Sequence, residues 1–232
     1  MPTTSRLSYP LLALSAPILL IGVDVVDAAT RPGYEPARHW ISHLSLGDRG
    51  WLGTAKLAVV GLLILLVAMG LRTASRATSD PVRRGSFLAH RWVAAAGSGL
   101  LLAAVFPMDP GLGFPPGATP GQSWRGTLHD LAAGVLFVSL TVAGWRLGRD
   151  LHRAHHGTGW RTAGRVVAAT VILAFLACTA LVSLDYAGTW PGAPSGLLER
   201  IAAYTGLAWV GVAASRALRT RREPSAGQPH TP

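Results

Sequence analysis

Long apolar stretches alternate with short polar segments along nearly the whole chain. Each apolar stretch holds about 20 residues, the length that a helix needs to cross the hydrocarbon core of a bilayer. The polar segments between them are too short to fold as separate domains. The pattern therefore predicts an all-α membrane protein, a bundle of six transmembrane helices at 9–28, 51–71, 87–107, 126–146, 165–186 and 197–217.

Composition agrees with a membrane protein. The 232 residues are 50% hydrophobic and 14% charged, whereas soluble domains carry about 25% charged residues. The single cysteine, Cys178, cannot form an intrachain disulfide, and no zinc-finger spacing is present. The net charge of +10 could indicate nucleic acid, but the arginines cluster at the ends of the apolar stretches. We therefore expect membrane lipids as partners and no nucleic acid.

The basic residues gather on one predicted side of the membrane. Fifteen of the 21 basic residues lie at the N-terminus, in the second and fourth connections with their helix ends, and at the C-terminal end. That side sums to +12 and the other to −2. Because positive charge stays inside, both termini are predicted to be cytoplasmic, in the bacterial cytoplasmic membrane. We expect one transmembrane domain over 1–222 and a disordered polar tail over 223–232.

The first helix has an alternative interpretation. Arg6, the apolar core and "VDA" before Ala29 are also compatible with a signal peptide cleaved after Ala28. The acidic residues near the end of this helix favour a helix that is retained because it has a function.

The stretch "FPMDPGLGFPPGATPGQSWRGTLHD" is a polar outer segment between two apolar ones. Pro107 and Pro110 end the third helix, because proline cannot continue the hydrogen-bond ladder. Asp109 then lies at the membrane edge, and His129 lies at the start of the fourth helix. We predict that Asp109 and His129 approach each other across this loop. Two structural alternatives stay open: Asp109 could form a turn or cap, and His129 could simply pack.

Other polar residues are predicted to lie at the same outer side. Ionisable groups within transmembrane segments are expensive, so each is a candidate functional residue. Interfacial or purely structural roles stay open for all of them. The candidates are Asp24, Asp27, His39, Ser42, His43 and Asp185.

Three short motifs resemble the bacterial domain of unknown function 998 family. They are "HWISHLSLGDRGWLG", "FPMDP" and "GTLHD", and the resemblance covers roughly residues 10–215. It implies a multi-pass topology, directs attention to Ser42, Asp109 and His129, and implies no reaction. A weaker analogy is to seven-helix membrane hydrolases, including alkaline ceramidases and progestin and adipoQ receptors, which use three histidines, an aspartate and a serine around zinc. Here His39, His43, His129 and Asp109 could imitate that set, although the helix count differs.

The sequence leaves three functions open. The first is an intramembrane enzyme, using either zinc held by His39, His43 and His129 or general acid–base chemistry on a lipid-like or isoprenoid substrate. In both forms Asp109, His129, Asp24, Asp185 and Ser42 are the candidate catalytic residues. The second is a small proton-coupled transporter with Asp24, Asp185 and His129 as its relay. The third is a non-catalytic scaffold or partner protein. Neither the substrate nor the oligomeric state follows from the sequence.

Overall fold

A computed structural model describes residues 5–76, 87–154 and 157–219. Over these residues the chain is helical and contains no β-strand. A short 3-10 helix, η1, occupies the first connection, at Ile41–Ser45. The long helices are α1 (Ser5–Thr30), α2 (Gly50–Arg76), α4 (Phe87–Val105), α5 (Trp124–Arg153), α6 (Gly159–Tyr186) and α7 (Ser195–Arg219).

Most of these helices are suited to a membrane. Among the described residues, five are long and apolar enough to cross one, and α4 contributes a shorter apolar segment, Ala89–Val105. The all-helical, multi-pass prediction is therefore confirmed at this level. The helices are longer than most of the predicted segments; α5, for example, continues from 146 to Arg153. Arginine is a good helix former, so the backbone stays helical after the apolar residues end.

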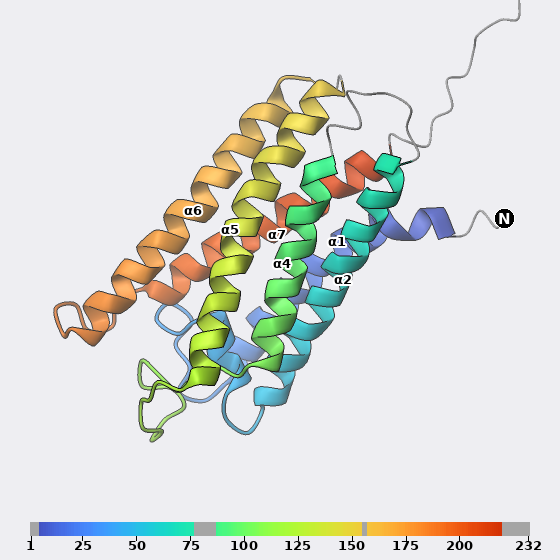
Figure 1. Cartoon of the computed structure of the whole chain (residues 1–232). Helices are drawn as coiled ribbons and strands as arrows, with labels where there is room; N and C mark the ends of the chain where they lie inside the picture. Colours follow the sequence, from blue (N-terminus) through green and yellow to red (C-terminus); the bar gives the residue numbers. More distant parts are fainter. Residues whose placement is uncertain (1–4, 77–86, 155–156, 220–232) are drawn as a thin grey trace, which may run out of the picture.

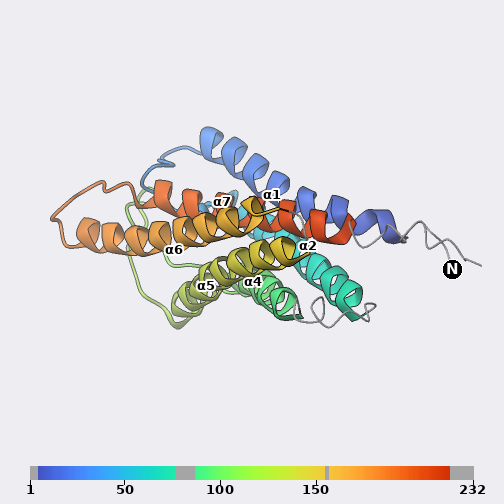
Figure 2. The same ribbon diagram turned by 90° about the horizontal axis from the view of Figure 1, so that it is seen from above.

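The helices pack as a closed ring in chain order, and α7 returns to contact α1 (Figures 1 and 2). α7 also contacts α5 and α2, so the helix that closes the ring packs across its inside as well. A continuous core of mainly alanine, valine and leucine side chains joins the helices. The packing is close at small residues: a Cβ atom on Gly97 of α4 would lie 2.9 Å from the carbonyl oxygen of Gly61 in α2.

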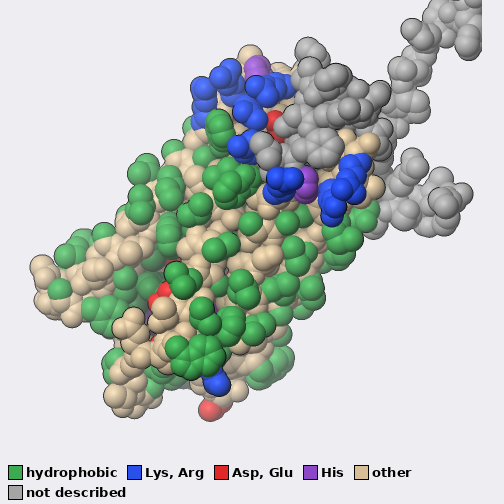
Figure 3. Space-filling view, in the orientation of Figure 1, with side chains coloured by type: hydrophobic (Ala, Val, Ile, Leu, Met, Phe, Trp, Pro, Cys, Tyr) green, Lys and Arg blue, Asp and Glu red, His purple; other side chains and the backbone are tan. Residues whose placement is uncertain are grey.

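The two ends of the bundle differ (Figures 1 and 3). At one end lie the connections 31–49, 106–123 and 187–194, and we call it the loop-covered end. At the other end, which we call the basic end, arginines concentrate at the helix termini (Figure 3). The described arginines of the basic end are Arg72, Arg76, Arg91, Arg146, Arg149, Arg153, Arg161, Arg165, Arg216 and Arg219.

Candidate functional site

The first connection, 31–49, folds into the loop-covered end instead of extending away from it. Tyr34 and Leu44 pack with Phe114 of the second connection and with Ala28 at the end of α1. His39, Ser42 and His43 are buried with them. Polar side chains buried in this way need internal partners, because an unpaired buried polar group is costly.

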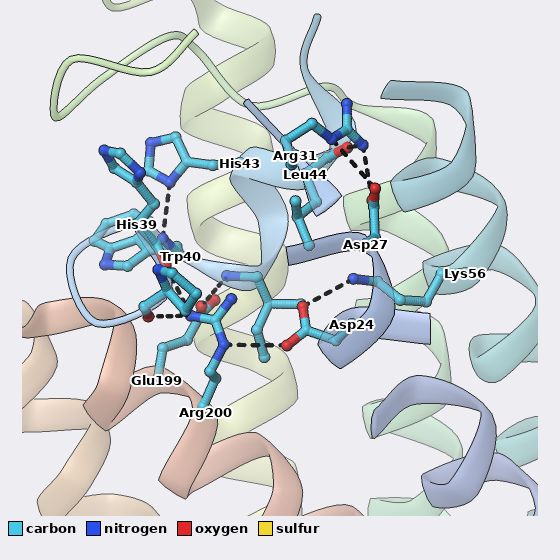
Figure 4. Close-up of polar contacts among 12 residues, drawn as sticks. Asp24, Asp27, Arg31, His39, Trp40, His43, Leu44, Lys56, Glu199 and Arg200 are labelled. Carbon is cyan, nitrogen blue, oxygen red and sulfur yellow. Dashed lines mark hydrogen bonds and ion pairs between the residues drawn. The ribbon is translucent and has the colours of Figure 1, made fainter. Parts of the chain in front are cut away.

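Asp24 is the centre of a buried charge network (Figure 4). Its carboxylate accepts hydrogen bonds from Lys56 Nζ in α2 at 3.2 Å and from Arg200 Nε in α7 at 3.0 Å. The hydroxyl of Tyr204 in α7 also donates to it. The Lys56 side chain is 0% exposed and that of Asp24 is 1% exposed. The network links α1, α2 and α7, and removing one partner would cost about 3–5 kcal/mol because a buried charge would be left without its counter-ion.

Arg200 extends the network into the first connection. Its Nη1 donates to the carbonyl oxygens of Pro36 at 2.6 Å and His39 at 2.8 Å. Its Nη2 donates to the Tyr34 hydroxyl, and its guanidinium carbon lies 5.5 Å from the centre of the Tyr34 ring. The fold of the connection therefore depends on a cation from the last helix.

A second charge cluster fixes both ends of the same connection. Asp27 accepts from Arg31 Nη2 and from Arg49 Nη2, each at 2.7 Å. Arg31 also donates to the carbonyl oxygens of Leu44 at 3.0 Å and Leu46 at 3.2 Å. These bonds satisfy carbonyl groups that the irregular backbone would otherwise leave without partners.

Backbone donors define the neutral tautomers of His39 and His43. Nδ1 of His39 accepts from the Glu35 N–H at 2.8 Å, and Nδ1 of His43 accepts from the Trp40 N–H at 3.0 Å. The ring proton of each must then be on Nε2. In His39 that proton is donated to the Leu112 carbonyl oxygen at 3.1 Å, whereas Nε2 of His43 is buried without a hydrogen-bond partner in the described part of the chain.

Both of these imidazoles favour the neutral form. Burial, above all, lowers the pKa of His43 to about 3, and the neighbouring His39, His129 and Arg200 act in the same direction. Burial also lowers the pKa of His39. The two rings lie 5.8 Å apart, centre to centre.

Asp109 and His129 bond to different partners. Asp109 accepts from the backbone N–H of Ser123 at 2.6 Å and from its hydroxyl at 2.7 Å. Ser123 in turn caps α5 by accepting from the Gly126 N–H at 3.1 Å. Asp109 therefore supports a helix cap, as in the structural alternative. No hydrogen bond joins Asp109 to His129 among the residues described, so their predicted approach stays a prediction.

The imidazole of His129 has the opposite tautomer. Its Nδ1 contacts the carbonyl oxygens of Ala103 at 3.0 Å and Phe106 at 2.8 Å, just before the end of α4 and just beyond it. Carbonyl oxygens only accept, so Nδ1 must carry the proton. In neutral His129, Nε2 is therefore the basic nitrogen.

His129 lines a cavity of about 30 Å³ inside the bundle at the loop-covered end. Most of its wall is aliphatic or aromatic, from α1, η1, α2, α4, α5 and α7. Three side chains in the wall carry polar groups: His129, Ser42 and Glu199. Glu199 also accepts a hydrogen bond from the Ile41 N–H, which fixes η1 against α7.

The remaining candidates have separate environments. Asp185 forms a two-point ion pair with Arg38, at 2.9 and 3.0 Å, and does not line the cavity. Asp24 belongs to the Lys56–Arg200 network, so these two aspartates and His129 lie in three different sets of contacts. In the described part of the chain, no group of three or more His, Cys, Asp or Glu side chains is arranged to hold a metal ion.

Sequence reasoning missed the charged partners inside the bundle. Lys56 is the only lysine and falls within the predicted second helix. The argument that an ionisable group within a transmembrane segment is a candidate functional residue therefore applies to Lys56 as it does to Asp24. Glu199 and Arg200 stand together near the start of the last apolar stretch. In the sequence they contribute only to the net charge of −2 on the outer side. In the structure Glu199 is the carboxyl group of the cavity and Arg200 is the central cation of the charge network.

The helices and their packing define a multi-pass helical membrane protein. A family model described as "Protein of unknown function (DUF998)" matches residues 14–216. The chain belongs to this family, which confirms the resemblance seen in the sequence motifs. No curated protein and no solved structure matches the chain.

Proposed function

We propose that the chain crosses the bacterial cytoplasmic membrane six times, with both termini in the cytoplasm. The 19 residues of α4 would extend about 28 Å at roughly 1.5 Å per residue, which is close to the hydrocarbon thickness of about 30 Å. The arginines of the basic end support the orientation, because positively charged ends stay inside.

Reporter fusions test this topology. Fusions at 115 and 192 should report the outside, and fusions at 80, 155 and 225, which lie outside the described residues, should report the cytoplasm. A fusion at 115 that reports the cytoplasm would contradict the orientation.

We further propose that the loop-covered end binds a lipid-like or isoprenoid molecule and acts on it by general acid–base chemistry. The observation that carries this proposal is the cavity, where a mainly apolar wall contains an imidazole, a carboxyl group and a hydroxyl. Apolar pockets with a few convergent polar groups are the usual form of small-molecule sites.

The polar groups of the cavity suggest a division of roles. Nε2 of His129 is the group that would accept a proton, because Nδ1 is committed to two carbonyl oxygens. Glu199, held by the Ile41 N–H, is the second group that could donate or accept one. Ser42 offers a hydroxyl to orient a polar head. At about 30 Å³ the cavity has room for two or three water molecules, since each needs roughly 10–15 Å³. A lipid-like ligand would therefore place only one end of its molecule in the cavity.

Binding can be tested by filling the cavity. Ala203 of α7 lines it, and Ala213 of the same helix is buried elsewhere. The full chain would be purified in mild detergent, and co-purifying lipophilic molecules would be extracted and quantified by mass spectrometry. We expect the wild type and Ala213→Val to retain such a molecule and Ala203→Val to lose most of it. Equal retention by all three proteins would contradict the binding site.

Chemistry is tested separately from binding. The lipid profiles of cells expressing the wild type, His129→Gln, Glu199→Gln and the control Asp185→Asn would be compared. We expect the wild type and Asp185→Asn to change one class of lipid-like molecule, and the two cavity variants to leave it unchanged. If the cavity variants change the profile as the wild type does, the acid–base role is wrong while the binding site stands.

A further inference from the structure

At the basic end, α5 and α6 touch through their backbones. A Cβ atom on Gly148 would lie 2.6 Å from the carbonyl oxygen of Trp160 and 2.8 Å from Cα of Gly164. Each helix carries two arginines within two residues of these contact positions. These arginines are Arg146 and Arg149 in α5 and Arg161 and Arg165 in α6.

Two of these arginines share an aromatic ring, and the Nε donor of each lacks a hydrogen-bond acceptor among the described residues. The guanidinium carbons of Arg146 and Arg149 lie 5.5 and 5.1 Å from the centre of the Trp145 ring. Nε of each is buried and has no hydrogen-bond partner in the part of the chain that the structure describes. Asp150 lies 3.8 Å from Arg149 Nε, which is too long for a hydrogen bond.

This arrangement differs from that of the cations at the loop-covered end. Arg200 donates to a carboxylate and to carbonyl oxygens, whereas within the described ranges the Nε donors of Arg146 and Arg149 have no acceptor at hydrogen-bond distance. A buried donor without an acceptor is unfavourable. Both residues are only partly buried, so an anionic group from outside the chain can reach the rest of their guanidinium groups.

We propose that this crossing binds the headgroup of an anionic phospholipid, with the phosphodiester oxygens accepting from Arg146 and Arg149. Basic pockets between transmembrane helices bind such headgroups, and tryptophan prefers the headgroup level. The adjoining surface of α6 supplies a place for the acyl chains. Only 22% of the apolar window of α6 is buried, compared with 39–56% in the other four long apolar helices, and Val166, Leu173 and Leu176 are exposed.

Native mass spectrometry of the full-length protein in detergent tests the site. The protein would be titrated with phosphatidylglycerol and with phosphatidylcholine of the same chain length. We expect tighter binding of phosphatidylglycerol to the wild type. The double variant Arg146→Gln/Arg149→Gln should weaken it by about 30-fold, on the order of fivefold for each arginine near an anionic headgroup.

A matched control separates a built site from general positive charge. Arg72→Gln/Arg76→Gln removes the same charge from exposed positions at the same end, in α2. We expect it to weaken phosphatidylglycerol binding by less than about threefold. Equal losses in the two double variants would overturn the proposal, as would equal binding of phosphatidylcholine. Inorganic phosphate should not displace the lipid at millimolar concentration; displacement would mean that the site takes free phosphate instead. Thermal unfolding would verify that the variants fold.

Discussion

The two ends of the bundle use positive charge in opposite ways. At the loop-covered end, the side chains of Lys56, Arg31 and Arg200 are 0%, 5% and 9% exposed, and each bonds to a carboxylate. At the basic end, Arg72, Arg76, Arg153, Arg161 and Arg165 are exposed. Sequence position alone does not separate these two uses of a cation. What separates them is whether a carboxylate or carbonyl oxygen lies opposite the cation inside the bundle.

The comparison leads to different expectations for the two ends. Removing a partner from a buried pair leaves an uncompensated charge, whereas removing a solvated charge changes little. Substitutions at the loop-covered end should therefore alter stability, and those at the basic end should mainly alter contacts with lipid.

The largest effect is expected for Asp24→Asn. Lys56 and Arg200 would lose the carboxylate that they share, and the free energy of unfolding should fall by about 3–5 kcal/mol. Thermal unfolding in detergent, followed by tryptophan fluorescence, would measure the loss. Adding Lys56→Met to Asp24→Asn should cost less than the sum of the two single changes, because no buried ammonium group is left without its partner. Additive losses would show that the pair is not coupled.

The next effect is a pH dependence centred on His43. Its pKa is about 3 in the folded chain, against an ordinary value of 6.5. The unfolded chain therefore binds the proton first as the pH falls. Stability should decrease as the pH falls from about 6.5 towards 3, by up to about 1.4 kcal/mol per pH unit from this group. His43→Asn, which keeps an acceptor for the Trp40 N–H, should flatten this slope; an unchanged slope would assign it to other groups.

A smaller effect is expected for Ser123→Ala at the start of α5. This change removes the acceptor of the Gly126 N–H and one donor to Asp109, and it should destabilise the protein by about 1 kcal/mol. Thr127→Ala is the control, because the exposed Thr127 hydroxyl donates only to the backbone carbonyl oxygen of Ser123, which Ser123→Ala leaves in place. A similar loss in both variants would mean that the cap contributes little.

The smallest effect is expected at the basic end. Arg76 is exposed at the last residue of α2, and Arg76→Gln should change the free energy of unfolding by no more than about 0.5 kcal/mol. A loss comparable to that of Asp24→Asn would remove the distinction between the two ends.

The sequence predicted the helices well, because about 20 apolar residues in a row have few alternatives to a membrane helix. The predicted end of the third helix at Pro107 is also close to the observed one, since α4 ends at Val105, two residues earlier. Helix ends were less predictable, since arginine continues a helix as readily as it marks the membrane surface. The family assignment followed from short motifs near Ser42, Asp109 and His129, and the family match confirmed it.

The internal partners were harder to predict. Asp24 and Arg200 are separated by 176 positions, and a single sequence does not show that α1 and α7 are neighbours. Ser42 and His129 were among the predicted candidates, and both line the cavity. The third polar residue of the cavity is Glu199. The sequence does not place it there, because its position beside Ser42 and His129 depends on how α7 packs against the other helices.

The Asp24–Arg200 bond also has a consequence for biosynthesis. At about 5–20 residues per second, a ribosome needs roughly 9–35 s to make the 176 positions between them. During this interval the nascent first helix holds a carboxylate whose final guanidinium partner has not been synthesised. Lys56 is made only 32 positions after Asp24. A hairpin of α1 and α2 that forms early can therefore pair the Asp24 carboxylate with the Lys56 ammonium group. Ribosome-bound chains truncated before and after residue 56 should therefore differ in how completely their first helix enters the membrane.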